Sequence, residues 1–132
     1  MKQFTKRLTP GQDLKGEIEK IVQEKSIRAG CILSIAGSLK KATLRLADGK
    51  KVQSWSKQFE IISGTGTVSK NGCHIHISLA DAKGQVIGGH LKEGCTINTT
   101  AEIVLIIFNK VEYKRRFDNQ TGYEELEVIY TQ

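Results

Sequence analysis

Turn signals that contain glycine divide the sequence after residue 30 into short segments with the composition of β-strands. The dipeptides Asp48-Gly49 and Asn71-Gly72 are typical of tight hairpins, and Asn71-Gly72 favours a type I′ turn. Gly37-Ser38 interrupts another apolar run as either a bulge or a turn. Strands joined by hairpins pair antiparallel. We predict strands at residues 4–8, 31–39, 42–46, 52–62, 73–79, 85–91, 96–108, 111–117 and 124–130.

Only one segment of the chain, near its start, has a strongly helical pattern. The carboxylate of Asp13 is placed to cap this helix by accepting from the free backbone N–H groups of its first turn. Gly30 follows where a left-handed residue commonly ends a helix. One helix before many short strands predicts an α+β fold, with a largely antiparallel β-sheet and one main N-terminal helix. The apolar residues at helical spacing are Leu14, Ile18, Ile21 and Val22.

The length of 132 residues corresponds to a single domain, residues 1–132. The start has no apolar segment typical of a secretory signal. The most apolar run, residues 103–108, is too short to span a membrane. Cys31, Cys73 and Cys95 show no CxxC spacing. This pattern is typical of reduced thiols, so we expect a cytoplasmic protein.

Positive charge is concentrated in the first half of the chain. The net charge is +6, made of +7 in residues 1–66 (13 basic, 6 acidic) and −1 in residues 67–132 (7 basic, 8 acidic). A basic half suits a polyanionic partner such as DNA, and Trp55 among the bases suits stacking on a nucleotide. The alternative is a solvated hairpin whose lysines protect an edge strand from aggregation. The candidate DNA-binding residues are Lys40, Lys41, Arg45, Lys50 and Lys51.

The three histidines of the chain lie in two neighbouring predicted strands. His74 and His76 alternate with Ile75 and therefore share a face, about 6.5–7 Å apart along the strand. The short connection 80–85 folds the next strand back and brings His90 close to them. Three neutral imidazoles suit Zn²⁺ or a similar divalent ion and leave one coordination position open. Because HxH pairs also occur on ordinary strand faces, the alternative is a set of structural or surface histidines.

Glu102 is the candidate general base for chemistry at such a metal. It stands between Ala101 and Ile103 in an apolar strand, where a carboxylate needs a partner or a shifted pKa. Ser78 and Asp81 are candidates for orienting an imidazole, although each also suits a turn or a surface. No residue pattern indicates the substrate.

Five groups of motifs occur in the order that is typical of one family. The most specific group runs from Gly72 to Asp81 and continues with Gly84 and Gly88-Gly89-His90-Leu91. The other groups are Arg7-Leu8 with Pro10-Gly11 and Asp13-Leu14; Gly30 to Ser38 with Ala42, Leu44 and Arg45; Phe59-Glu60-Ile61 with Ser63, Gly64 and Gly66; and Thr100 to Val104 with Thr121 to Leu126. Together they resemble the PPC domain (plants and prokaryotes conserved; DUF296) over essentially the whole chain.

The resemblance implies an α+β fold that associates as a homotrimer and holds zinc through the three histidines. It also implies that Arg7, Arg45 and Glu102 line the same region or the subunit interface. In plants the domain follows an AT-hook, the Arg-Gly-Arg-Pro element that reads DNA, and this chain contains no such motif. The DNA-binding function given to prokaryotic members therefore transfers weakly.

Two functions remain open at this point. The first is a trimeric module that binds DNA or another partner and carries a three-histidine metal site. The second is a metal-dependent enzyme or small-molecule-binding protein that uses His74, His76 and His90. A purely structural metal is a third interpretation, and an open coordination position would argue against it.

Overall fold

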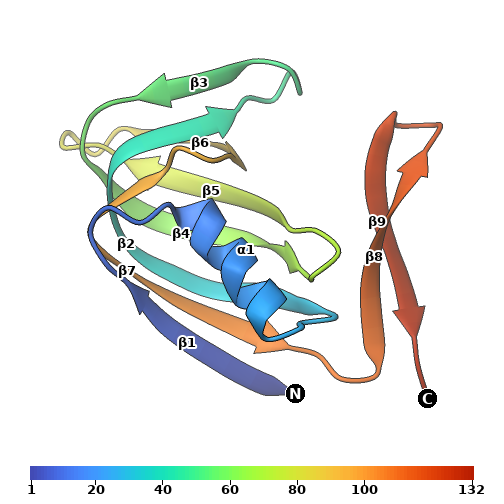
Figure 1. The fold of residues 1–132 in the computed structure, drawn as a ribbon. Helices are drawn as coiled ribbons and strands as arrows, with labels where there is room; N and C mark the ends of the chain where they lie inside the picture. Colours follow the sequence, from blue (N-terminus) through green and yellow to red (C-terminus); the bar gives the residue numbers. More distant parts are fainter.

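The computed structural model describes residues 1–132 and confirms an α+β fold with one helix and mostly antiparallel strands (Figure 1). The elements follow one another as β1 (Lys2–Leu8), α1 (Leu14–Glu24), β2 (Gly30–Arg45), β3 (Val52–Trp55), β4 (Phe59–Val68), β5 (His74–Ala80), β6 (Val86–Leu91), β7 (Thr96–Ile107), β8 (Val111–Asp118) and β9 (Tyr123–Tyr130).

Seven strands form one curved sheet in the spatial order β1-β7-β2-β4-β5-β6, with β3 paired to β2 beside this path. The end of β2 also pairs with β6, where Leu44 faces Leu91 and Arg45 faces His90. Strands β2, β4, β5 and β6 therefore close into a ring, which brings Arg45 beside a histidine. Strands β8 and β9 form a separate hairpin that stands apart from the main sheet in Figure 1.

The longest strand differs from its prediction. The segments 31–39 and 42–46 belong to the single 16-residue strand β2, whose register against β7 shifts between Gly37 and Leu39. Gly37-Ser38 is thus a bulge inside a continuous strand. A Cβ on Gly37 would lie 2.1 Å from the backbone oxygen of Thr100, so only glycine permits this close approach.

The predicted strand 52–62 is divided, because β3 pairs with the end of β2 whereas β4 pairs with its first half.

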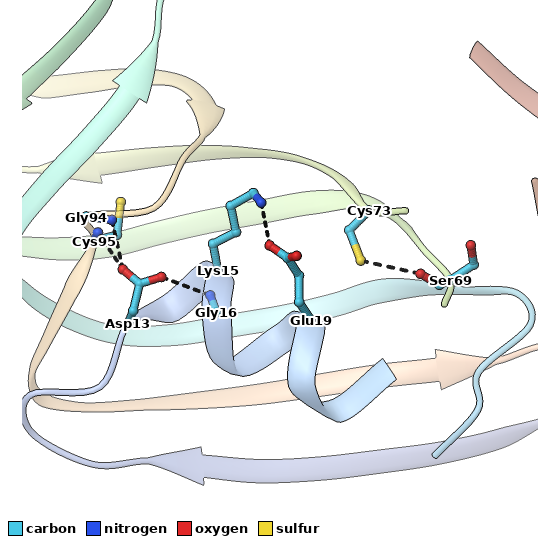
Figure 2. Close-up of polar contacts among 8 residues, drawn as sticks. All are labelled: Asp13, Lys15, Gly16, Glu19, Ser69, Cys73, Gly94 and Cys95. Atoms are coloured by element: carbon cyan, nitrogen blue, oxygen red, sulfur yellow. Dashed lines mark hydrogen bonds and ion pairs between the residues drawn. The ribbon is translucent and has the colours of Figure 1, made fainter. Parts of the chain in front are cut away.

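The helix α1 begins where the sequence predicts, and the Asp13 carboxylate makes three backbone hydrogen bonds there (Figure 2). Its Oδ2 accepts from the N–H of Gly16 at 2.9 Å, which caps the helix. Its Oδ1 accepts from the N–H groups of Gly94 and Cys95 at 2.8 and 3.1 Å. One side chain therefore fixes the start of α1 to the connection between β6 and β7.

Two turn predictions were wrong in detail. Gly30 does not end the helix; it begins β2, where a Cβ would lie 2.6 Å from the backbone oxygen of Ile106. Ser26, with a φ of 49°, has the left-handed conformation after α1 instead. The hairpin is confirmed, but hydrogen bonds between Ser69 and Gly72 place Lys70 and Asn71 at the centre of its turn, and neither of them has a positive φ. A type I′ turn requires a positive φ at both central residues, so this turn belongs to another type.

The hydrophobic core lies between α1 and one face of the sheet. Leu14, Ile18, Ile21 and Val22 are all buried, as their spacing predicts, and they belong to a cluster of 23 buried apolar residues. Each fully buried side chain of this size contributes about 1.5–3 kcal/mol. At 11 residues, α1 is too short and too polar to cross a membrane, and the structure has no other helix.

Candidate metal centre

The histidines are positioned by the hairpin of β5 and β6. His76 and His90 are direct cross-strand partners, and His74 lies two residues before His76 on the same face of β5. Ile75 and Ile77, on the opposite face, are buried in the core. Burial of these isoleucines fixes which face of β5 turns outward, and the imidazoles therefore converge at the surface, as the sequence predicts.

The three imidazoles lie close enough to share one ion. The Nε2 atoms of His74 and His76 are 3.2 Å apart, and one ring nitrogen from each histidine lies within 4.8 Å of the other two. Ring centroids are separated by 4.8, 5.1 and 5.7 Å. Two nitrogens bound to one tetrahedral zinc at 2.0–2.1 Å are about 3.3 Å apart. The donor set and its spacing therefore fit a zinc-like ion, with His90 needing the larger adjustment.

The surroundings favour the neutral, ligating form of the imidazoles. Burial lowers the pKa of His90 to about 4, and the nearby Arg45 guanidinium adds to this shift. Burial, followed by the neighbouring His76, also lowers the pKa of His74. Neutral imidazole is the form that binds a divalent ion. By contrast, burial raises the pKa of the Cys95 thiol to about 11, which disfavours a thiolate ligand.

A cleft of about 540 Å³ opens beside the histidines. The Nη2 atom of Arg45 lies 3.5 Å from Nδ1 of His90, and its guanidinium carbon lies 5.8 Å from the centroid of the Tyr123 ring. Arg115, on β8, donates from Nη2 to the hydroxyl of Thr67 at 3.0 Å. The separate β8–β9 hairpin therefore contributes side chains to the same cleft as the main sheet.

Glu102 is not brought to the histidines within this chain. It is exposed on β7, opposite Arg7 of β1 and Ala36 of β2. Ala36 precedes Arg45 by nine residues, or about 30 Å along an extended strand. Of the candidates for orienting an imidazole, Ser78 bonds to Ser63 and Asp81 binds Lys57.

Sequence reasoning did not link Arg115 or Tyr123 to this site. Both lie in the β8–β9 hairpin, far along the chain from Arg45 and the histidines. The sequence signals were the family motif Thr121 to Leu126, which contains Tyr123, and a basic cluster around Arg115, whose alternate residues point to opposite faces of a strand. The cluster consists of Lys110, Lys114, Arg115 and Arg116. Nothing in that pattern states which part of the main sheet the hairpin approaches.

The candidate DNA-binding residues fall into two groups. Lys40 and Lys41 are exposed within β2, and Lys50 and Lys51 are exposed in the β2–β3 connection; none of the four forms an ion pair. Arg45 is half-buried and lies beside His90. The lysines thus form a solvated basic surface, whereas Arg45 belongs to the histidine cleft.

A family model and several known proteins match this chain. The model of the Plants and Prokaryotes Conserved (PCC) domain matches residues 1–109, which end before β8. The bifunctional protein GlmU of Synechococcus sp. (strain JA-2-3B'a(2-13)) is 45% identical over 128 residues, covering 97% of this chain and 20% of that protein. The chain therefore spans about a fifth of the length of the curated relatives it matches.

Solved structures share the fold over nearly the whole chain. A hypothetical protein from Salmonella cholerae-suis is 33% identical, with a TM-score of 0.95 and coverage of 99% of this chain and 95% of that one. A protein from Archaeoglobus fulgidus, described as metal-containing, is 32% identical, with a TM-score of 0.84 and coverage of 96% and 94%. A Bacteroides thetaiotaomicron protein, provisionally named as DNA-binding, is 21% identical, with a TM-score of 0.85 and coverage of 95% and 91%. At that identity the likeness shows the fold alone.

Proposed function

Because the chain belongs to the Plants and Prokaryotes Conserved (PCC) domain family, the one its motifs resemble, we propose that it is a metal-binding module of that family. Zinc or a similar divalent ion is held by His74, His76 and His90. The observation that carries this proposal is the 3.2 Å separation of the His74 and His76 Nε2 atoms, opposite the cross-strand partner His90. A relative described as metal-containing, 32% identical to this chain, supports it.

The roles of the residues follow from their positions. The three imidazoles supply neutral nitrogen donors, and Arg45 beside His90 favours its unprotonated form. With three protein ligands, a bound divalent ion keeps an open position from which it can polarise a carbonyl or lower the pKa of water. Two of the histidines that would hold the ion, His74 and His90, line the cleft, which supports a small-molecule-binding or enzymatic role over a purely structural metal.

Measuring the metal content of the purified protein tests this proposal directly. Protein purified without a polyhistidine tag is expected to carry about one equivalent of zinc or a similar ion per chain by elemental analysis. His74→Ala and His90→Ala each remove one donor and should weaken zinc binding by about 100-fold or more in calorimetric titration. Ser78→Ala is the matched control, since Ser78 shares the outward face of β5 and bonds to Ser63. Unchanged metal content in both histidine variants would show that the ion binds elsewhere.

We also propose that the module is a homotrimer. The β8–β9 hairpin forms a sheet separate from the main one, and several of its apolar side chains are exposed to solvent. Exposed apolar groups of this kind mark surfaces that bind another protein. The residues concerned are Phe117, Tyr123, Leu126, Val128 and Tyr130.

DNA binding is the second candidate function, and the lysine surface supports it. Four exposed lysines without ion-pair partners lie at the two ends of the β2–β3 pairing, in which the half-buried Trp55 faces Ala42. A homotrimer would present three such surfaces and a net charge of +18, three times the +6 of one chain. Binding through phosphates would weaken steeply as salt rises.

Fluorescence anisotropy with duplex DNA tests this second function. We expect binding at about 50 mM salt, lost by about 200 mM. Lys40→Ala with Lys41→Ala should weaken it and flatten its salt dependence, because each lost phosphate contact reduces the slope by about 0.9. Lys57→Ala is the control, since Lys57 is held by Asp81 at 3.1 Å. The function is rejected if the wild type does not bind at about 50 mM salt.

A further inference from the structure

We propose that the cleft beside the histidines binds a small carboxylic acid, whose carboxylate is held by Arg45 and Arg115. The proposal rests on the metal site proposed above and names the class of molecule that this site receives. It assigns to both arginines a role in recognising the ligand, next to the open position of the ion.

The first support is that neither arginine has an acidic partner. The four ion pairs of the chain are Lys15–Glu19, Arg28–Glu112, Lys57–Asp81 and Arg116–Glu127. Arg45 and Arg115 are each half-buried and belong to none of them. A half-buried guanidinium without a counter-ion is costly, and a bound anion would compensate it.

The second support is an unsatisfied donor on Arg45. Its Nε atom is buried and has no hydrogen-bond partner. Its Nη2 atom reaches only Nδ1 of His90, at a long 3.5 Å. The guanidinium packs near the face of Tyr123, which restrains the side chain without using its N–H groups. Arg45 is thus restrained in position and retains donors for a ligand.

The third support is where these groups lie. Arg45, Arg115, His74 and His90 all line one cleft, so an acid bound there contacts the arginines and lies next to the ion. Arg115 is tethered by a single hydrogen bond to Thr67, which leaves most of its five N–H groups free. Arginine pairs with the planar carboxylate through two parallel hydrogen bonds.

Acidic residues on the rim limit the charge that a ligand of this cleft needs to carry. Glu124 and Glu125 also line the cleft and are exposed, so their negative charges face an incoming ligand. They offset the two arginines, and the remaining excess of positive charge comes from the bound ion. The two glutamates thus lower the positive potential of the cleft and reduce the electrostatic advantage that a doubly charged phosphate would have over a singly charged carboxylate. The volume of about 540 Å³ suits a small molecule.

Calorimetric titration of zinc-loaded protein tests the proposal with pyruvate and glycolate as probes. Their neutral amides, pyruvamide and glycolamide, keep the shape and remove the charge. At least one acid should bind about tenfold or more tightly than its amide and than inorganic phosphate. Zinc content is measured on the same samples, so a failure of the metal site is seen separately from a failure of acid binding.

Arginine variants locate the binding site. Arg115→Met should weaken binding of the acid by about 10- to 100-fold while zinc content stays at one per chain. Arg45→Met should weaken acid binding by a similar factor in protein saturated with zinc. Arg116→Met is the matched control, because Arg116 neighbours Arg115 but is exposed and paired with Glu127. Thermal unfolding identifies any variant that is misfolded, and Arg115→Met is the informative one if Arg45→Met unfolds.

Three results would overturn the proposal. The first is that neither acid binds zinc-loaded protein more tightly than its amide. The second is that phosphate binds more tightly than both acids. The third is that Arg116→Met weakens binding as much as Arg115→Met does.

Discussion

Single carboxylates fix the ends of the elements that carry the site. Asp13 accepts from three backbone N–H groups and joins α1 to the connection that follows β6, the strand of His90. Asp81, directly after β5, accepts from the backbone N–H groups of Lys83 and Gln85 at 2.9 and 3.0 Å and pairs with Lys57 at 3.1 Å. Because Asp81 closes the turn between β5 and β6, it helps to hold the three histidines in register.

Asp81 makes the stability of this turn depend on pH. The hydrogen bond from Lys57, followed by those from the backbone, holds the pKa of Asp81 below its usual range. The folded-state pKa is thus lower than the unfolded-state pKa. The contribution to the free energy of unfolding is therefore complete above about pH 4 and is lost as the pH falls through the folded-state pKa.

Asp81→Asn is expected to lower the free energy of unfolding at pH 7, and its difference from the wild type should narrow toward about pH 3. Urea unfolding at several pH values, with EDTA present to remove metal, measures this difference. In a Lys57→Met background the effect of Asp81→Asn should be smaller, because the largest cause of the shift is gone. A difference that stays constant from pH 7 to pH 3 would contradict the assignment.

At the scale of elements, the pairing of β4 with β5 determines where His74 lies. Thr67 faces His74, Thr65 faces His76, and Gly66 stands between them opposite Ile75. A Cβ on Gly66 would lie only 1.9 Å from the backbone oxygen of His74, at a φ of 155°. Because Gly66 has no side chain, β4 can approach β5 closely at this point, and β5 carries the two ligands His74 and His76.

Gly66→Ala is expected to lower the free energy of unfolding by about 2–4 kcal/mol and to weaken zinc binding by about tenfold or more. The added methyl group must push β5 away and displace His74. Gly84→Ala is the control, since Gly84 also has a positive φ, of 79°, but has open space around it. Gly84→Ala should lower the free energy of unfolding by only about 1 kcal/mol and leave zinc affinity unchanged. Equal effects of the two substitutions on zinc affinity would refute the role of this close contact.

At the scale of the whole molecule, the β8–β9 hairpin is tied to the segment just before β2 of the main sheet by the Arg28–Glu112 ion pair and also carries two surfaces relevant to function. Through Arg115 and Tyr123 it reaches the histidine cleft, and through Leu126, Val128 and Tyr130 it presents apolar groups to solvent. Residues two apart share one face of a strand, so these three form one stripe along β9. The proposed homotrimer would cover this stripe and restrain the hairpin beside the cleft.

Light scattering after size exclusion is expected to give about three times the 14.6 kDa mass of one chain. Leu126→Ser combined with Val128→Ser should shift the mass toward that of the monomer, because both side chains lose apolar area that the association buries. Val52→Ser, at a similarly exposed residue on β3, should not change the mass. A monomeric wild type at all concentrations would refute the trimer.

Much of the fold is predictable from local pattern. The apolar spacing of Leu14 to Val22 and the cap at Asp13 predict α1, and turn dipeptides predict most strands. The errors arise where neighbouring strands decide the outcome. Gly37 is a bulge because β7 continues to pair across it, and Gly30 begins β2 because β7 approaches it closely. The dipeptide Gly37-Ser38 itself indicates a bulge or a turn, whereas no residue adjacent to Gly30 indicates its close contact with β7.

The residues of the candidate metal centre also differ in whether the sequence predicts their position. Alternation along β5 and the short connection to β6 suffice to bring His74, His76 and His90 together, because these interactions are local in sequence. The sequence alone therefore determined the strands, the helix and the cluster of imidazoles. The family resemblance implies that Arg45 and Glu102 line the same region or the subunit interface, but only the tertiary structure placed Arg45 beside that cluster, added Arg115 to it and left Glu102 away from it within the chain. The physical reason is that closure of the β2–β6 ring and the position of the β8–β9 hairpin depend on packing between segments far apart in the chain.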